Sequence, residues 1–326
     1  MTLRSCVMTG VAIAAMATLA LTSGKAAAEL PPSPITLVAG ATGGSTDLAV
    51  RAIAARIEEM GGPHFVIENR PGGGGVPAAI GVRNAKPDGR TLLVASYSAF
   101  VVGRLMEEKE AFSPLKDFKL ITTLFTFPLV AVVNAGLEAR SVDELAALSK
   151  RKKEGIVNGT QGVGAAGHLL GEMFAQSTGA NVVHVPYKGA GQAIVDLVAG
   201  RTDMMFVSFA PSAPHIKAGK LRALAIATDG RIAAAPDLPT FAELGHPDVS
   251  SNFVWFGLAA PRETPDSVTQ SIREWFVKAV QDEALRKRLD VQGIKLESSS
   301  ADVFAKRIAN DAKTLRPIVE AAQKKK

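Results

Sequence analysis

Short apolar, β-rich runs alternate with amphipathic helical stretches along most of this 326-residue chain, and that alternation constrains the fold most. Strands are predicted at 35–39, 65–68 and 92–95, with helices over 48–60 and 78–85 between them. Strands and helices that alternate in this way form βαβ units, in which helices cover both faces of a parallel sheet. The sequence therefore predicts an α/β fold of the doubly wound kind.

A second series of the same kind begins at residue 128. Its predicted strands and helices are strand 128–134, helix 141–150, a strand opening at Gly155, helix 167–177, strand 182–185, helix 190–199, strand 203–207, helix 212–218 and strand 221–227. A Ser-x-x-Glu capping box, Ser141 to Glu144, opens the first of these helices. Strand 253–259 and helices 265–289 and 300–322 follow. Two such units predict two lobes with a ligand cleft between them, at the carboxyl ends of the strands. We expect lobe 1 to comprise 29–127 plus 254–326, and lobe 2 to comprise 128–253, so that the chain crosses twice at a hinge.

Residues 1–28 have the three-part organisation of a secretory signal peptide. Arg4 precedes an apolar run at 11–21, and the small residues at 26–28 offer a cleavage site. Cys6 is the only cysteine and lies ahead of the apolar run, so the mature chain has no disulfide. No later stretch approaches the length of a membrane span. We expect a soluble, exported protein, and a bacterial periplasm fits best.

Two glycine-rich turns, at 39–47 and 158–168, each join a predicted strand to a predicted helix. The first turn of a helix has unpaired N–H groups and a partial positive charge, so an anion can bind there. Hydroxyl groups add polar contacts in both turns; they belong to Thr42, Ser45, Thr46 and Thr160. Two such termini facing each other predict an anion clamp. The alternative is that Ser45 and Thr46 only cap a helix and the glycines only make tight turns.

The sequence gives weaker indications of other kinds of binding site. Gly162–Gly167 matches G-x-G-x-x-G, so an exported α/β enzyme that binds a dinucleotide is an alternative, although Tyr187-Lys188 stand where an acidic residue is expected. His168 and Glu172 lie four residues apart on one predicted helix but lack further metal ligands. A net charge of +6 with two Trp and two Tyr argues against nucleic-acid binding. We expect no cofactor, no bound metal and no catalytic residues.

The sequence resembles the Bug family, the extracytoplasmic solute-binding receptors of tripartite tricarboxylate transporters. The matching runs follow the family's order over nearly the whole mature chain: GGSTD, VIENRPGGGG, KPDGRTLL, GHLLGEMF, VPYKGAGQAIVDLVAGRTDMMF, IKAGKLRALAIAT, PDLPTFAELG and WFGLAAP. The resemblance implies a periplasmic binding protein of type II, a Venus flytrap, with no activity of its own. It implies a small carboxylate ligand, transporter membrane subunits as partners, and a monomer.

The resemblance also implies which residues contact the ligand. They are Thr42, Gly43, Gly44, Ser45, Thr46 and Asp47 from the first loop, Thr160, Gln161, Gly164, Ala165 and His168 from the second, and Ser96, Tyr97 and Asp203 at strand ends. Tyr187 is a further candidate for a wall of the cleft. Asp47 has an alternative role in satisfying its own helix start, and Asp203 in holding a hinge. The second loop has fewer hydroxyl groups than is usual in the family, which leaves the identity of the carboxylate open.

Overall fold

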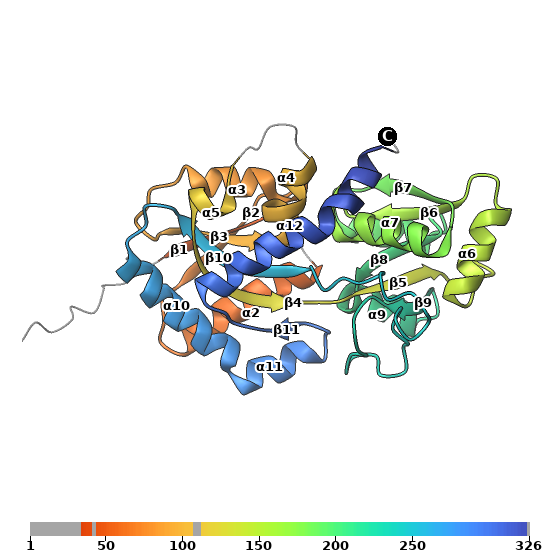
Figure 1. Cartoon of the computed structure of the whole chain (residues 1–326). Helices are drawn as coiled ribbons and strands as arrows, with labels where there is room; N and C mark the ends of the chain where they lie inside the picture. The colour runs from red at the N-terminus through yellow and green to blue at the C-terminus, as the bar shows by residue number, and fades with distance from the viewer. Residues whose placement is uncertain (1–33, 41–43, 107–111, 325–326) are drawn as a thin grey trace, which may run out of the picture.

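The computed structural model describes residues 34–40, 44–106 and 112–324, which form two lobes side by side (Figure 1). The sheet of the first lobe has six strands. In spatial order they are β11 (Lys295–Leu296), β4 (Phe118–Thr126), β10 (Trp255–Pro261), β3 (Thr91–Ser96), β1 (Ile35–Ala39) and β2 (Phe65–Asn69). The sheet of the second lobe has five, in the order β7 (Val182–Pro186), β6 (Ile156–Thr160), β8 (Met204–Ser208), β5 (Leu129–Asn134) and β9 (Leu221–Ile226).

Both sheets are mixed, whereas the sequence predicted parallel sheets. β1 is parallel to β2 and β3, and β6 is parallel to β7 and β8. The strands on either side of the crossings break the pattern, because β10 runs antiparallel to β3 and β4, and β5 runs antiparallel to β8 and β9. In each sheet the antiparallel strand, β10 or β5, is the one that the chain enters after it crosses from the other lobe, and a βαβ pattern does not report this.

Helices cover both sheets. Those of the first lobe are α2 (Gly44–Glu59), α3 (Val76–Arg83), α4 (Gly103–Met106), α5 (Pro114–Asp117), α10 (Asp266–Gln281), α11 (Glu283–Asp290) and α12 (Ala301–Lys324), with short helical turns at Gly73–Gly75 and Ser98–Val102. Those of the second are α6 (Val142–Arg151), α7 (Ala166–Thr178), α8 (Ala190–Val198) and α9 (Phe209–Lys217). α12 packs on β4 and also on α7, so it joins the two lobes (Figure 1).

The second sheet buries both of its faces. Val130 and Val132 of β5 pack in one core with Ile194 of α8, whereas Ala131 and Val133 belong to the other core with α7. Because successive side chains of a strand point to opposite faces, α7 and α8 lie on opposite sides of this sheet. This confirms the doubly wound architecture.

The two crossings between the lobes lie against each other. Phe127-Pro128 links β4 to β5, and a loop ending at Val254 leads into β10. The amide of Leu129 donates to Ser251 Oγ at 3.1 Å, and that hydroxyl donates to the carbonyl of Ala227 at 2.6 Å. One buried serine therefore joins the two crossing segments, as a hinge requires.

Several elements differ from the sequence prediction, among them the short elements α4, α5 and β11, which it does not contain. The helix predicted over 265–289 is two helices, because Asp282 ends α10 and caps α11, where its carboxylate accepts from the amide of Leu285 at 2.8 Å. The predicted cap at Ser141 is present, since its hydroxyl accepts from the amide of Glu144 at 3.1 Å. β4 was not predicted; it is paired with β10 along its length.

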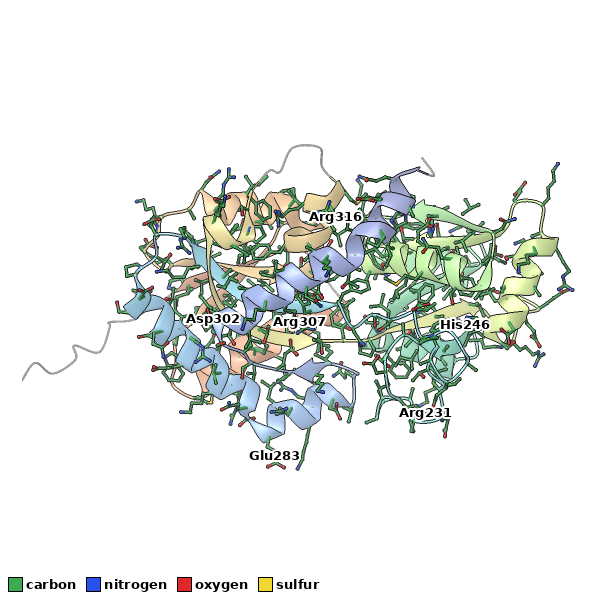
Figure 2. All side chains as sticks on the ribbon, in the orientation of Figure 1. Arg231, His246, Glu283, Asp302, Arg307 and Arg316 are labelled. Carbon is green, nitrogen blue, oxygen red and sulfur yellow. The ribbon has the colours of Figure 1, made fainter. Side chains whose placement is uncertain are left out.

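Of the side chains labelled in Figure 2, Arg231, Glu283, Asp302 and Arg316 are exposed, whereas His246 and Arg307 are partly buried. Arg231 pairs with Glu243 at 3.1 Å, and Arg307 pairs with Glu297 at 2.5 Å. The first pair is exposed and contributes little to stability, whereas the second is partly buried. Among the described residues, no helix combines the length and the apolar character that a membrane span requires.

Candidate functional site: a cavity between the lobes

A cavity of about 480 Å³ lies between the two lobes. Strand ends surround it: Ser96 and Tyr97 follow the body of β3, Gln161 follows β6, and Ser208 ends β8. These are the carboxyl ends of their strands, where ligands bind in open α/β sheets. The predicted cleft is therefore present at the predicted edge of both sheets.

Glycines shape the first-lobe side of this cavity. A Cβ atom on Gly40 would lie 2.6 Å from the Cα of Gly75, so the loop after β1 and the loop after β2 touch through their backbones. The run Gly72–Gly75 adopts positive φ throughout, a region that side chains disfavour. Both features bring bare backbone to the cavity wall; the sequence predicted this for the loop that follows β1 but not for Gly72–Gly75.

The start of α2 forms another part of that wall. Gly44, Ser45 and Thr46 line the cavity, and the last two are buried. First-turn amides of a helix have no acceptor within the helix, so they are suited to an anion. Ser45 Oγ also donates to Ser208 Oγ of the other lobe at 2.9 Å, which joins the lobes across the cavity.

The predicted clamp needs a correction at the second lobe, because the protein's own groups already occupy most of the amides there. The amide of Gly164 donates to His168 Nδ1 at 3.2 Å, and the amide of Ala165 donates to the carbonyl of Gly162 at 3.2 Å. The amide of Ala166 donates to the Tyr97 hydroxyl at 2.7 Å, across the lobes. The start of α7 therefore stabilises its own loop and the contact between the lobes.

Because the Ala166 amide is occupied, the Tyr97 hydroxyl can act in its place as the donor toward the cavity. Burial raises the pKa of its phenol, and the smaller opposing effect is the hydrogen bond from Ala166. The hydroxyl thus stays protonated while it accepts from Ala166, and its own hydrogen is available to a solute. The ring packs edge-to-face on Phe253 and Phe256, with centroids 5.3 and 6.4 Å apart, which holds it in place.

The second lobe contributes Tyr187 and Lys188 to the wall. The Tyr187 hydroxyl donates to Asp196 at 2.8 Å; burial, followed by this hydrogen bond, raises the pKa of the phenol. Lys188 is exposed, and it is the one charged residue among the described residues that line the cavity. A lysine ammonium on its flexible stem can neutralise an anionic solute.

The remaining wall is apolar. The rings of Phe127 and Phe256 are stacked, with centroids 5.4 Å apart and planes 26° apart. Both residues belong to the segments at the hinge, and Val94, Leu129, Val207 and Val254 extend this surface. We call these six residues the hinge wall.

Eight of the predicted site residues line the cavity: Gly44, Ser45, Thr46, Ser96, Tyr97, Gln161, Ala165 and Tyr187. Thr42 and Gly43 lie outside the described residues. The cavity lining does not include Asp47, Thr160, Gly164, His168 or Asp203.

Local partners and burial explain why Asp47, Asp203 and Thr160 do not line the cavity. Asp47 accepts from Arg51 at 2.9 Å and from Asn69 at 3.1 Å; burial raises its pKa, but these hydrogen bonds outweigh burial and hold the pKa below its usual range. Asp203 pairs with Lys152 at 2.8 Å, and Thr160 is fully buried. Each carboxylate braces its own lobe, which corrects the expectation that Asp203 faces the cleft.

Sequence reasoning missed two groups of lining residues. The hinge wall was interpreted as ordinary strand and loop, because its apolar residues resemble core. The sequence also did not single out Lys188, Gly189 and Ala190 as lining residues. Only the position of each group in the sequence could have indicated its role, because each group follows the end of a strand or flanks a crossing between the lobes.

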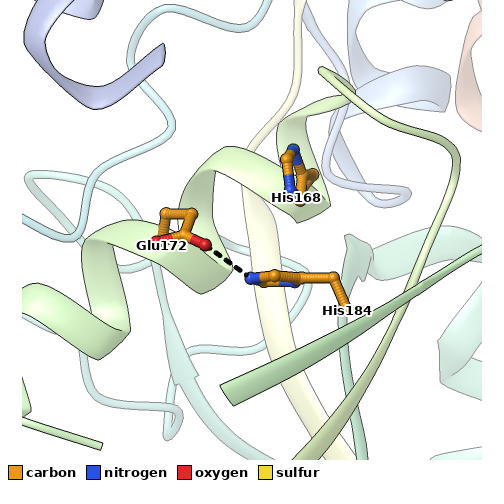
Figure 3. Close-up of side chains that lie close together, drawn as sticks. All are labelled: His168, Glu172 and His184. Carbon is orange, nitrogen blue, oxygen red and sulfur yellow. Dashed lines mark hydrogen bonds and ion pairs between the residues drawn. The ribbon is translucent and has the colours of Figure 1, made fainter. Parts of the chain in front are cut away.

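His184 joins His168 and Glu172 in a cluster whose ligand atoms lie within 4.8 Å of one another (Figure 3). His184 is the third member, which sequence spacing did not indicate. Glu172 is 1% exposed and lies 3.1 Å from His184 Nε2. The cluster lies on α7 and β7, outside the cavity lining.

Hydrogen bonds at the other ring nitrogens argue against a metal in this cluster. Asn158 Nδ2 donates to the carbonyl of Gly167 at 3.1 Å, and this orientation makes His184 Nδ1 the acceptor of a second bond, also 3.1 Å. His168 Nδ1 accepts from Gly164. A histidine that binds metal normally donates from its second nitrogen. Both rings instead accept there, so their Nε2 atoms carry protons and the cluster is a hydrogen-bonded brace.

The two α/β lobes and the cavity between them define a solute-binding receptor of the periplasmic-binding-protein type. The chain belongs to the tripartite tricarboxylate transporter receptors: the model of that family, described as "Tripartite tricarboxylate transporter family receptor", matches residues 49–323. This confirms the family that the sequence resembles. The family consists of receptors, not enzymes, and nothing in the comparisons supports the dinucleotide alternative.

Similar sequences and solved structures support the assignment to this receptor family. Protein BugT of Bordetella pertussis is 32% identical over 280 residues, covering 85% of this chain and 86% of BugT. A structure described as "R. palustris Rpa4515 with adipate" has a TM-score of 0.85 at 29% identity, covering 90% of this chain and 99% of that one. MatC from Rhodopseudomonas palustris with bound malate has a TM-score of 0.79 at 28% identity, covering 87% and 98%.

Proposed function

We propose that this receptor captures a small carboxylate in the cavity between its lobes and presents it to the membrane subunits of a transporter. The observation that carries the proposal is the cavity itself, bounded by the start of α2, the Tyr97 hydroxyl and Lys188. These groups offer N–H, O–H and cationic donors to an anion. Structural relatives with adipate and with malate support a carboxylate as the ligand.

The cellular setting follows from the amino end of the sequence. Residues 1–28 act as a cleaved signal peptide, and the mature receptor works in the periplasm as a monomer without a nucleic-acid partner. The description of a relative as "periplasmic binding protein BugD" supports this location. We place the lobe boundaries at 29–127 plus 254–326 and at 128–253, since the strands of each sheet fall within these ranges.

Isothermal titration calorimetry with a panel of mono-, di- and tricarboxylates tests the proposal. We expect at least one acid of the panel to bind, with one molecule bound per chain. Lys188→Gln should weaken that binding several-fold, because the variant removes the cation at the cavity rim. Lys217→Gln is the matched control, since Lys217 is exposed at the end of α9 and outside the cavity lining. Failure of every acid in the panel to bind, or equal loss in both variants, would contradict the proposal.

A further inference from the structure

We infer that the preferred solute is a monocarboxylate with an apolar body, an aryl or medium-chain alkyl acid, and that di- and tricarboxylates bind more weakly. This inference rests on the proposed function and specifies it further. It concerns the number of carboxylates that the cavity can satisfy, which depends on the charges, the unoccupied donors and the apolar surface around it.

The charge around the cavity suits a single carboxylate. Lys188 is the one charged side chain among the described lining residues. Arg51 and Arg70, which could have met a second anionic group, pair with Asp47 at 2.9 Å and with Glu68 at 2.6 Å. A second negative charge would therefore find no cation at the described wall.

Donors suited to an anion remain in both lobes, but only one of them is cationic. The amides of Gly164, Ala165 and Ala166 bond to groups of the protein itself, so they are not open to a second carboxylate. The start of α2 and the Tyr97 hydroxyl remain in the first lobe, and in the second lobe Gly189 and Ala190 at the start of α8 line the cavity beside Lys188. Of the described lining residues only Lys188 can neutralise a carboxylate, so a second carboxylate would have to bind through neutral donors alone.

The hinge wall occupies the rest of the lining. Phe127 and Phe256 present stacked rings, and the valines and Leu129 continue the surface. A carboxylate placed against this wall would lose its water without gaining a hydrogen bond or a counter-ion, which is strongly unfavourable. An aryl or alkyl group gains there by removing apolar surface from water. A cavity of about 480 Å³ also falls within the range that accommodates bodies larger than a four-carbon acid.

Pairs of acids that differ by one carboxylate test the inference directly. Calorimetry on the full mature receptor compares hexanoate with adipate, and benzoate with terephthalate, with hexanamide as the uncharged control. We expect the monocarboxylate to bind at least about tenfold more tightly in each pair, and hexanamide to bind far more weakly than hexanoate. Equal or tighter binding of adipate and terephthalate would overturn the inference and leave the proposed function intact. If none of these acids binds and citrate and malate also fail, both the inference and the proposed function are wrong.

A charge added to the hinge wall provides a second test. Phe127→Lys places a cation at the half-buried start of this wall, and it should shift the affinity ratio toward adipate by about tenfold or more. Val183→Lys is the control, because Val183 is 47% exposed and outside the lining. An unchanged ratio in a folded Phe127→Lys protein would overturn the inference. If that variant does not fold, the pairs of acids on the unmodified receptor still decide the question.

Discussion

The hydrogen bond between the Tyr97 hydroxyl and the amide of Ala166 should control how readily the lobes close. Tyr97→Phe removes the acceptor and keeps the ring that packs on Phe253. In the closed arrangement the Ala166 amide would then be buried without a partner, whereas water would satisfy it once the lobes separate. An unsatisfied buried amide costs about 1–3 kcal/mol. We therefore expect the closed population to fall by roughly 5- to 150-fold relative to the open one.

Spin-label distance measurements can report this change, because Cys6 is the only cysteine of the sequence. Labels at Val66→Cys on β2 and Val195→Cys on α8 would lie on different lobes, and both positions are exposed. Cys6→Ser removes the one native thiol. The distance distribution should broaden and shift toward longer separations in Tyr97→Phe.

Tyr187→Phe is the control for this measurement. Its hydroxyl bonds to Asp196 within the second lobe, so its loss should leave the distances between the lobes unchanged. Identical distributions for the unmodified protein and for Tyr97→Phe would refute the reasoning. So would an equal shift in Tyr187→Phe, because closure would then not depend on the bond between lobes.

Two further substitutions test the packing and the electrostatics of the first lobe. Gly40→Ala should lower the melting temperature by several degrees, because its Cβ would lie 2.6 Å from the Cα of Gly75 and overpacking costs about 1–3 kcal/mol; Gly191→Ala, with open space around it, should be neutral, and equal losses in calorimetric scans would contradict this. Burial raises the pKa of Asp311 more than the hydrogen bond from Trp255 and the charge of Arg307 lower it. The stability that the protonated carboxyl contributes is therefore full below its unfolded value of 3.8 and is lost as the pH rises through the folded value. Asp311→Asn should raise the melting temperature more at about pH 7 than at about pH 4, and an equal gain at both would count against this explanation.

Local patterns predicted most of the regular structure. Apolar runs such as 35–39 became buried strands, and the Ser141 cap formed where its spacing indicated. β4 was missed because polar Lys119, Thr122 and Thr123 interrupt its apolar run. Its pairing with β10, 129 or more residues away in sequence, decides its conformation, and no local pattern reports such a contact.

The site was only partly predictable for a related reason. Glycine-rich turns indicated where backbone could approach a ligand, and the start of α2 lies at the cavity as expected. Whether an amide is unoccupied depends on distant side chains. Tyr97 reaches Ala166 from the other lobe, and His168 turns back to Gly164. The sequence also did not indicate the hinge wall, because Phe127 and Phe256 have the apolar character of core residues. Only the folded chain, in which the two crossings lie together, shows that they line the cavity.

The central claim is that one carboxylate binds at the start of α2, while the start of α7 serves the protein's own contacts. Titration of ¹⁵N-labelled receptor with hexanoate, followed amide by amide, tests it most directly. The claim predicts saturable shifts at the amides of Ser45 and Thr46, with the Ala166 amide keeping its protection from solvent exchange. Shifts centred on Ala165 and Ala166, with Ser45 and Thr46 unaffected, would contradict it.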